Sequence, residues 1–159
     1  IQQKYKFKLG IMYFHGRGVK QNYVKAREWY LKAASQDHAG SQHNLGVIYN
    51  KGHGVRQDYV KAREWYLQAA SQHNPDAQNN LGVIYHNGQA VQQDFVKARE
   101  WYLKAASQHN PDAQNNLGVI YHKGQAVQQD FVKAREWFLK SAAQGHADSE
   151  SMLGNIYWR

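Results

Sequence analysis

Residues 81–116 read LGVIYHNGQAVQQDFVKAREWYLKAASQHNPDAQNN, and this stretch decides the fold because the chain repeats it with a fixed period. The leucine that opens it recurs every 36 residues, at Leu9, Leu45, Leu81, Leu117 and Leu153. A tryptophan keeps the same step, at Trp29, Trp65, Trp101 and Trp137. A fixed period of about 20 to 50 residues is the signature of a solenoid, in which each unit covers the apolar face of its neighbour.

Three motifs recur at this spacing and carry a resemblance to a known family. They are L-G-x-x-Y, then G-x-G-V, then D-[YF]-V-K-A-x-x-W-[YF]-x-[KQ]-A-A. Together they resemble the Sel1-like repeat, a relative of the tetratricopeptide repeat. The resemblance covers essentially the whole chain.

The resemblance implies an all-α fold, a right-handed α/α superhelical solenoid of helix pairs with about nine helices. We expect residues 1–159 to form a single repeat domain. Residues 1–8 would form the N-terminal part of the first helix, residues 9–44, 45–80, 81–116 and 117–152 four repeats, and residues 153–159 a truncated fifth repeat.

The residues themselves predict where the first helix of a unit begins and ends. In the helix that contains Leu81, Asn74 is the expected N-cap, Pro75 suits the first helical position, and Asp76 lies in the first turn beside the positive end of the helix dipole. Gly88 supplies the left-handed residue that ends the helix. We therefore predict a helix over residues 75–86.

A second helix is predicted over residues 95–107, with Asp94 as its N-cap. At 100° per residue, its apolar side chains form a stripe that covers about two thirds of the circumference. The members of this stripe are Phe95, Val96, Ala98, Trp101, Tyr102, Leu103 and Ala105. This pattern predicts a helix that is packed on both sides.

The loop between the two helices varies in one position. Gly18 and Gly54 stand before the valine in the first two loops, whereas Ala90 and Ala126 take their place in the next two. Alanine adopts a left-handed backbone less readily than glycine, which argues against one geometry shared by all four loops.

The composition and the charge distribution limit the classes of partner and site that this chain can have. The net charge is +8, but most of the excess lies in residues 1–44 and not along the whole array, which disfavours a nucleic-acid partner. The chain has no cysteine, so neither a disulfide framework nor a thiolate metal site is available. No apolar run is long enough for a transmembrane helix, so we expect no membrane insertion. No signal peptide is visible in the sequence given, and the compartment stays open.

In tetratricopeptide-like arrays the first helices line a concave groove, so the resemblance implies that a protein or extended peptide binds there. The expected groove residues are Lys4, Phe7, Lys8, Ile11, Phe14, His43, Asn44, Val47, Asn79, Asn80, Val83, His86, Asn115, Asn116, Val119 and His122. Asparagine carries both a donor and an acceptor and can bond the main chain of a peptide. The alternative is that these polar side chains only keep the surface soluble.

One arginine in each second helix projects toward the apolar arc, at Arg27, Arg63, Arg99 and Arg135. Two interpretations stay open. The aliphatic stem can pack on its neighbours while the guanidinium reaches water, or the arginines can form a row that faces a ligand.

The sequence holds no pattern typical of an enzyme or of a metal centre. No H-E-x-x-H pair, G-x-S-x-G elbow or phosphate-binding glycine loop interrupts the repeats. We therefore expect no catalytic residue, no cofactor and no metal. Cysteine-rich Sel1-like relatives imply one alternative, a β-lactam-binding or hydrolysing enzyme, which the absence of cysteine disfavours.

The fifth repeat lacks its second helix in this sequence. Leu153, Ile156 and Tyr157 therefore have no partner from their own repeat, and Trp158 would lie on the groove side. Two interpretations stay open: the sequence is a piece of a longer array, or the apolar end serves self-association through the C-terminal end.

Overall fold

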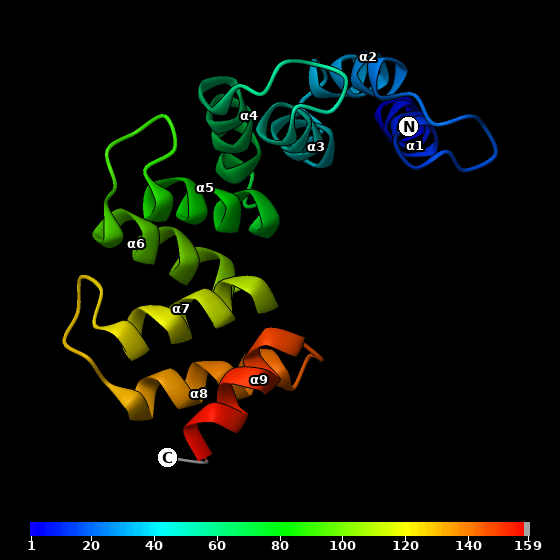
Figure 1. Ribbon diagram of the computed structural model, residues 1–159. Helices are drawn as coiled ribbons and strands as arrows, with labels where there is room; N and C mark the ends of the chain where they lie inside the picture. The colour runs from blue at the N-terminus through cyan, green and yellow to red at the C-terminus, as the bar shows by residue number, and fades with distance from the viewer. Residues whose placement is uncertain (158–159) are drawn as a thin grey trace. The chain divides into compact units, whose positions relative to one another are not determined.

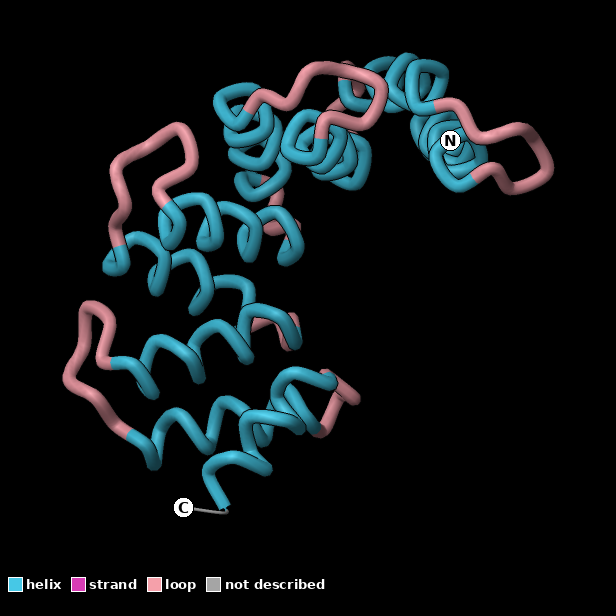
Figure 2. Tube along the Cα trace, in the orientation of Figure 1, coloured by secondary structure: helices cyan, strands magenta, loops and turns pink. Residues whose placement is uncertain are grey.

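The computed structural model describes residues 1–157, and all of their regular structure is helical (Figures 1 and 2). The helices of this described range are α1 (Gln2–His15), α2 (Tyr23–Ala34), α3 (Ala39–Lys51), α4 (Tyr59–Ser71), α5 (Pro75–Asn87), α6 (Phe95–Ala106), α7 (Pro111–Lys123), α8 (Phe131–Ala142) and α9 (Ala147–Tyr157). The predicted all-α repeat of helix pairs is confirmed.

The chain forms two compact units. The first covers residues 1–77 and contains α1 to α4 with the first turn of α5. The second covers residues 78–159 and contains the rest of α5 with α6 to α9. In the first unit α1 packs on α2, α2 on α3 and α3 on α4, and in the second α6 packs on α7, α7 on α8 and α8 on α9 (Figure 1).

Side chains cap the starts of α2 to α8, as predicted for Asn74 and Asp94. Asn22, Asp58, Asp94 and Asp130 precede α2, α4, α6 and α8, and each accepts a hydrogen bond of 2.9 to 3.0 Å from the backbone N–H three residues ahead. Asn74 and Asn110 cap α5 and α7 in the same way, at 2.9 Å. His38 caps α3, because its Nδ1 accepts from the Ser41 N–H at 3.1 Å. Each cap satisfies an N–H that has no partner inside its helix.

All four longer loops share one backbone pattern, contrary to the expectation from the alanines. Ala90 and Ala126 have φ of +56° and +55°, the same left-handed region as Gly18 and Gly54 at +73° and +65°. A glutamine closes each loop, since Nε2 of Gln21, Gln57, Gln93 and Gln129 donates at 2.8 Å to the carbonyl seven residues earlier. In the last two loops, these bonds stabilise the left-handed backbone of Ala90 and Ala126, which alanine adopts at a cost in energy.

An aromatic ring packed on a glycine forms the centre of each helix pair. The rings of Tyr30, Tyr66, Tyr102 and Phe138 are buried on Gly10, Gly46, Gly82 and Gly118 of the first helix. A Cβ at any of these glycines would overlap the ring carbons. Small buried alanines surround the ring, such as Ala98 and Ala105 in α6.

The predicted apolar stripe of the second helix is wrong at two positions. Val96 and Leu103 are 49% and 38% exposed, whereas Ala98 and Tyr102 are buried. The second helices do pack on both sides, because Trp65 of α4 and Trp137 of α8 contact the core clusters that contain Tyr30 and Tyr102, but the outer valine and leucine lie in water. Exposed apolar residues are normal on a folded surface, and periodicity alone does not separate them from the buried ones.

The last described helix is partly covered by its neighbour. Leu153 is buried against Ala134 and Phe138 of α8, and Ile156 packs against the same cluster. The side chain of Tyr157 and all of Trp158 lie outside the described residues. Self-association through this end stays a prediction. Among the residues described, no helix is long and apolar enough to cross a membrane.

The ring–glycine contact leads to a prediction on stability. Gly82→Ala should lower the free energy of unfolding by about 1 to 3 kcal/mol, because the new methyl group overlaps the buried Tyr102 ring. Gly154→Ala is the matched control, since nothing lies within 4 Å of its added Cβ. Urea denaturation followed by circular dichroism measures both.

The control should be neutral or stabilising by up to about 1 kcal/mol, because alanine favours helix over glycine. Equal losses in the two variants would show that the glycines matter for the helix itself and not for the contact with the ring.

Candidate partner-binding surface

The sixteen predicted groove residues, here called the first-helix face, lie on α1 and α3 of the first unit and on α5 and α7 of the second. The first unit contributes Lys4, Phe7, Lys8, Ile11 and Phe14 from α1 and His43, Asn44 and Val47 from α3. The second contributes Asn79, Asn80, Val83 and His86 from α5 and Asn115, Asn116, Val119 and His122 from α7. Most are half-buried; Lys4 and Lys8 are exposed and Asn79 is buried.

In the second unit, asparagines of this face bond successive first helices to one another. Asn116 Nδ2 donates to Asn79 Oδ1 at 3.0 Å, which links α7 to α5. Ser149 Oγ donates to Asn115 Oδ1 at 2.8 Å, which links α9 to α7. Asn79 is only 7% exposed, so its predicted place on a solvated surface is wrong. Asparagines of a first helix that face away from the second helix of the same pair therefore contact the first helix of a neighbouring pair.

In the first unit, Asn44 of the face lies beside the Tyr30 hydroxyl. Asn44 hydrogen-bonds this hydroxyl, and Asn44 Oδ1 also lies 3.2 Å from His43 Nδ1. Burial raises the pKa of Tyr30 to about 12, and the bond to Asn44 opposes that shift. Burial lowers the pKa of His43, while the Asp76 carboxylate and Asn44 raise it. Both groups are therefore neutral at pH 7.

The valines of the face pack partly into the core of the second unit. Val83 contacts the cluster that contains Tyr102 and Leu117, and Val119 contacts the cluster that contains Phe138 and Leu153. Both remain half-buried, so each also presents apolar surface to water.

On α1, aromatic and aliphatic side chains are covered more than predicted. Phe7, Ile11 and Phe14 pack against the core cluster that contains Tyr30 and Leu45. The Phe7 ring lies 4.6 Å from the His38 ring between centroids. Lys4 and Lys8 therefore form the accessible part of this end.

His86 and His122 stand beside the phenylalanine that begins the next helix. Their rings meet Phe95 and Phe131 edge-on at 5.1 and 5.3 Å between centroids. Both histidines are half-buried, and the Nδ1 atom of each has no hydrogen-bond partner. Burial and the charge of Lys123 lower the pKa of His86.

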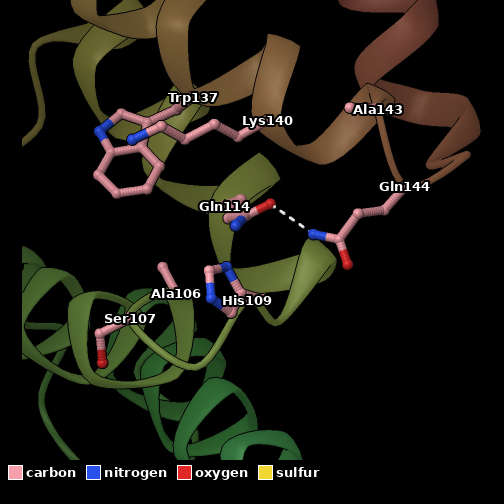
Figure 3. A pocket seen from close by; sticks show the side chains of 8 residues that line it. All are labelled: Ala106, Ser107, His109, Gln114, Trp137, Lys140, Ala143 and Gln144. Carbon is pink, nitrogen blue, oxygen red and sulfur yellow. Dashed lines mark hydrogen bonds between the residues drawn. The ribbon is translucent and has the colours of Figure 1, made fainter.

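Paired glutamines line a cleft that the sequence interpretation missed. In Figure 3, Gln144 Nε2 donates to Gln114 Oε1 at 2.8 Å, beside Trp137 and Lys140. The Lys140 ammonium lies 4.4 Å above the Trp137 ring, and the cleft has a volume of about 640 Å³. In the first unit, Gln72 and Gln42 form the equivalent pair at 2.7 Å. The sequence did contain a pattern that could have predicted these pairs, because the glutamines also recur every 36 residues.

The described residues do not gather a metal site. Within residues 1–157, no three His, Cys, Asp or Glu side chains lie close enough to hold one ion.

The repeated caps, ring–glycine contacts and inter-helix amide bonds agree with a match to one family. The family model of the Sel1 repeat matches residues 5–38, 39–74, 75–110 and 111–146. The chain is a Sel1 repeat protein. Proteins of this family commonly act as scaffolds for protein interactions.

Solved structures of similar proteins support the assignment. A Sel1 repeat protein from Oxalobacter formigenes is 33% identical over 98% of this chain and 63% of that one, with a TM-score of 0.92. A protective antigen of uropathogenic Escherichia coli with an SLR fold is 39% identical over 98% of this chain and 33% of that one, with a TM-score of 0.90. The present chain thus spans less than two thirds of either relative.

A cysteine-rich protein is also similar. Cysteine rich protein B of Helicobacter pylori is 26% identical over 87% of this chain and 99% of that one, with a TM-score of 0.64. The present Sel1 repeat protein has no cysteine. The comparison with curated proteins gave no match.

The half-buried histidines lead to a prediction on pH. The pKa values of His38, His43 and His86 are lowered from 6.5, in each case first by burial. The unfolded chain therefore binds more protons than the folded one just below pH 6.5, and stability should fall as the pH falls through that range. Urea unfolding between pH 8 and pH 5 measures the slope.

His38→Asn should make this slope shallower, because asparagine can still cap α3 but cannot take up a proton. His73→Asn is the matched control, since it replaces an exposed loop histidine. A slope that is unchanged in His38→Asn would contradict the assigned role of His38.

Proposed function

We propose that this Sel1 repeat protein is a non-enzymatic scaffold that binds an extended peptide, or an extended segment of a partner protein, along the first-helix face. The supporting observation is that residues 73–86 and 109–122 are the same 14-residue string, HNPDAQNNLGVIYH. Their helices, α5 and α7, are linked through the bond between Asn116 and Asn79. The second unit therefore offers the same side chains twice, one repeat apart, which suits an extended ligand more than a compact one.

Apolar contact comes from the valines and polar contact from the amides between them. Val83 and Val119 hold equivalent positions and are half-buried, so each leaves some apolar surface for a ligand. Asn80 and Asn116 are also half-buried and follow the same spacing. In the first unit, the exposed Lys4 and Lys8 would favour an acidic segment wherever a ligand contacts α1.

The asparagines are poor positions for a test of binding. Asn116→Ala removes the hydrogen bond to the buried Asn79, so it would weaken the array as well as any ligand contact. The valines avoid this difficulty, because the chain carries matching valines on the second helices.

The absence of native cysteine allows a site-specific test. Val83→Cys and Val119→Cys would carry a photo-reactive maleimide on the first-helix face, and the control variants Val96→Cys and Val132→Cys would carry it on exposed positions of α6 and α8. We expect both face variants to cross-link the same protein from an extract of the source cells, and the control variants to leave it unlabelled.

The affinity for that protein should then depend on the same valines. Val83→Asn combined with Val119→Asn should weaken binding about tenfold, which is about 1.4 kcal/mol, whereas Val96→Asn with Val132→Asn should not. Cross-links that form only from Val96→Cys and Val132→Cys would move the binding site to the second helices and contradict the proposal.

A further inference from the structure

The cleft of the second unit that holds the paired glutamines contains a buried amide with an unused donor. It lies between the turn that follows α6 and the turn that follows α8, and Gln114 near the start of α7 forms part of its wall (Figure 3). Its volume of about 640 Å³ is within the range of ligand sites. The cleft shares no residue with the first-helix face, so this inference does not rest on the function proposed for that face.

Gln114 is the unexplained group in this cleft. The residue is only 3% exposed, and its Oε1 accepts the hydrogen bond from Gln144 Nε2 at 2.8 Å. Within residues 1–157, the Nε2 of Gln114 has no acceptor of its own. This nitrogen still reaches the space of the cleft, and Figure 3 shows it turned away from Gln144, toward the side where Ala106 and His109 lie. Buried amides are normally hydrogen-bonded through both polar atoms, so a ligand in the cleft can supply the missing acceptor.

The charge of the cleft comes from a lysine that lies beside this amide donor. Lys140 is exposed, and its ammonium lies 4.4 Å above the Trp137 ring. His109, on the turn after α6, is also exposed. In the described part of the chain, no aspartate or glutamate lines the cleft. The cleft therefore offers N–H groups to an acceptor and favours a negative charge close to that acceptor.

The equivalent cleft of the first unit separates the shared features from the specific ones. It is lined by Asp37, Gln42, Gln68, Ser71 and Gln72, which stand two repeats before His109, Gln114, Lys140, Ala143 and Gln144. Gln42 is 2% exposed, and its Oε1 likewise accepts from Gln72 Nε2, at 2.7 Å. The amide pair is therefore common to both clefts. The charge differs, because Asp37 and Gln68 take the places of a histidine and a lysine.

We propose that the cleft beside Gln114 binds an acidic peptide segment of a partner protein. A backbone carbonyl of the segment accepts from Gln114 Nε2, since a neutral amide donor suits a neutral main-chain acceptor. An aspartate or glutamate next to that carbonyl pairs with Lys140, whose charge no acidic side chain of the cleft neutralises. The Trp137 ring and the methyl groups of Ala106 and Ala143 provide apolar contact for a neighbouring side chain. A peptide is favoured over a free small anion because Sel1 repeat proteins commonly act as scaffolds for protein interactions.

The repeat supplies a matched control. Gln114→Met and Gln42→Met each remove one amide and its bond to the glutamine of the following turn. Only the first of them removes it from a cleft that carries a lysine, whereas the second cleft is lined by Asp37. Lys140→Gln gives the cleft of the second unit the residue that stands at Gln68 in the first, and it changes an exposed side chain.

The test uses the whole chain and a fluorescein-labelled, amidated peptide in which aspartates alternate with leucines, with the asparagine version as the neutral probe. Fluorescence anisotropy measures the affinity, and nitrogen–proton NMR spectra follow the side-chain amide of Gln114. We expect saturable binding of the aspartate peptide that displaces the Gln114 Nε2 resonances and weakens as salt is raised. Gln114→Met and Lys140→Gln should each weaken the affinity about tenfold. Gln42→Met should leave it unchanged.

Several outcomes would overturn the inference. They are no saturable binding of the aspartate peptide, Gln114 resonances that do not move, equal losses in Gln114→Met and Gln42→Met, or equal affinity for the asparagine peptide. Acetate that binds as tightly as the peptide would show a site for small anions instead. Thermal melting checks the fold of each variant. If Gln114→Met unfolds, Lys140→Gln decides the matter, because wild-type affinity in that variant contradicts the proposed role of the lysine.

Discussion

The contact between an aromatic ring and a glycine sets the geometry on which the rest of each unit depends. The Tyr102 ring lies on the bare Cα of Gly82, and any side chain at that glycine would occupy the space of the ring. The two helices of a pair can therefore approach closely around one large side chain and several alanines. Close packing of this kind tolerates little change in volume. The distance between the helices then fixes which residues of the first helix remain for contacts outside the pair.

Those remaining residues are mostly polar, and many of them bond one helix to another. Gln144 bonds Gln114 within a pair, and Asn116 bonds Asn79 between successive first helices. Amides suit this role because each provides a donor and an acceptor. Buried polar groups with satisfied hydrogen bonds define one register between the helices, whereas apolar surfaces alone tolerate sliding. The polar surface that resembles a binding face thus also holds neighbouring first helices together.

The sequence predicted the local features well because their causes are local. A capping residue such as Asp94 acts on the N–H three positions ahead, and the period of 36 residues repeats that arrangement. The sequence did not predict that Asn79 is buried or that Val96 is exposed, because these depend on which neighbour covers which side. Helical periodicity gives the apolar side of a helix relative to its own axis. It does not show where the next helix pair lies, and so the candidate face was predicted in outline but not in its contacts.

A repeat protein also allows packing to be separated from other roles by comparing equivalent positions of one chain. Phe138 replaces the tyrosine of the earlier repeats and is still fully buried on Gly118, so the ring is sufficient for the packing. The hydroxyl of Tyr30 is therefore an addition, and its bond to Asn44 serves the first-helix face and not the core. The same comparison applies to Arg99 and Arg135, which share a sequence context and differ in burial. Arg99 is half-buried because the loop before α8 and the start of α8 lie against it, whereas no such loop follows α9 among the described residues, so the difference in burial reflects the neighbouring repeat and not the arginine itself.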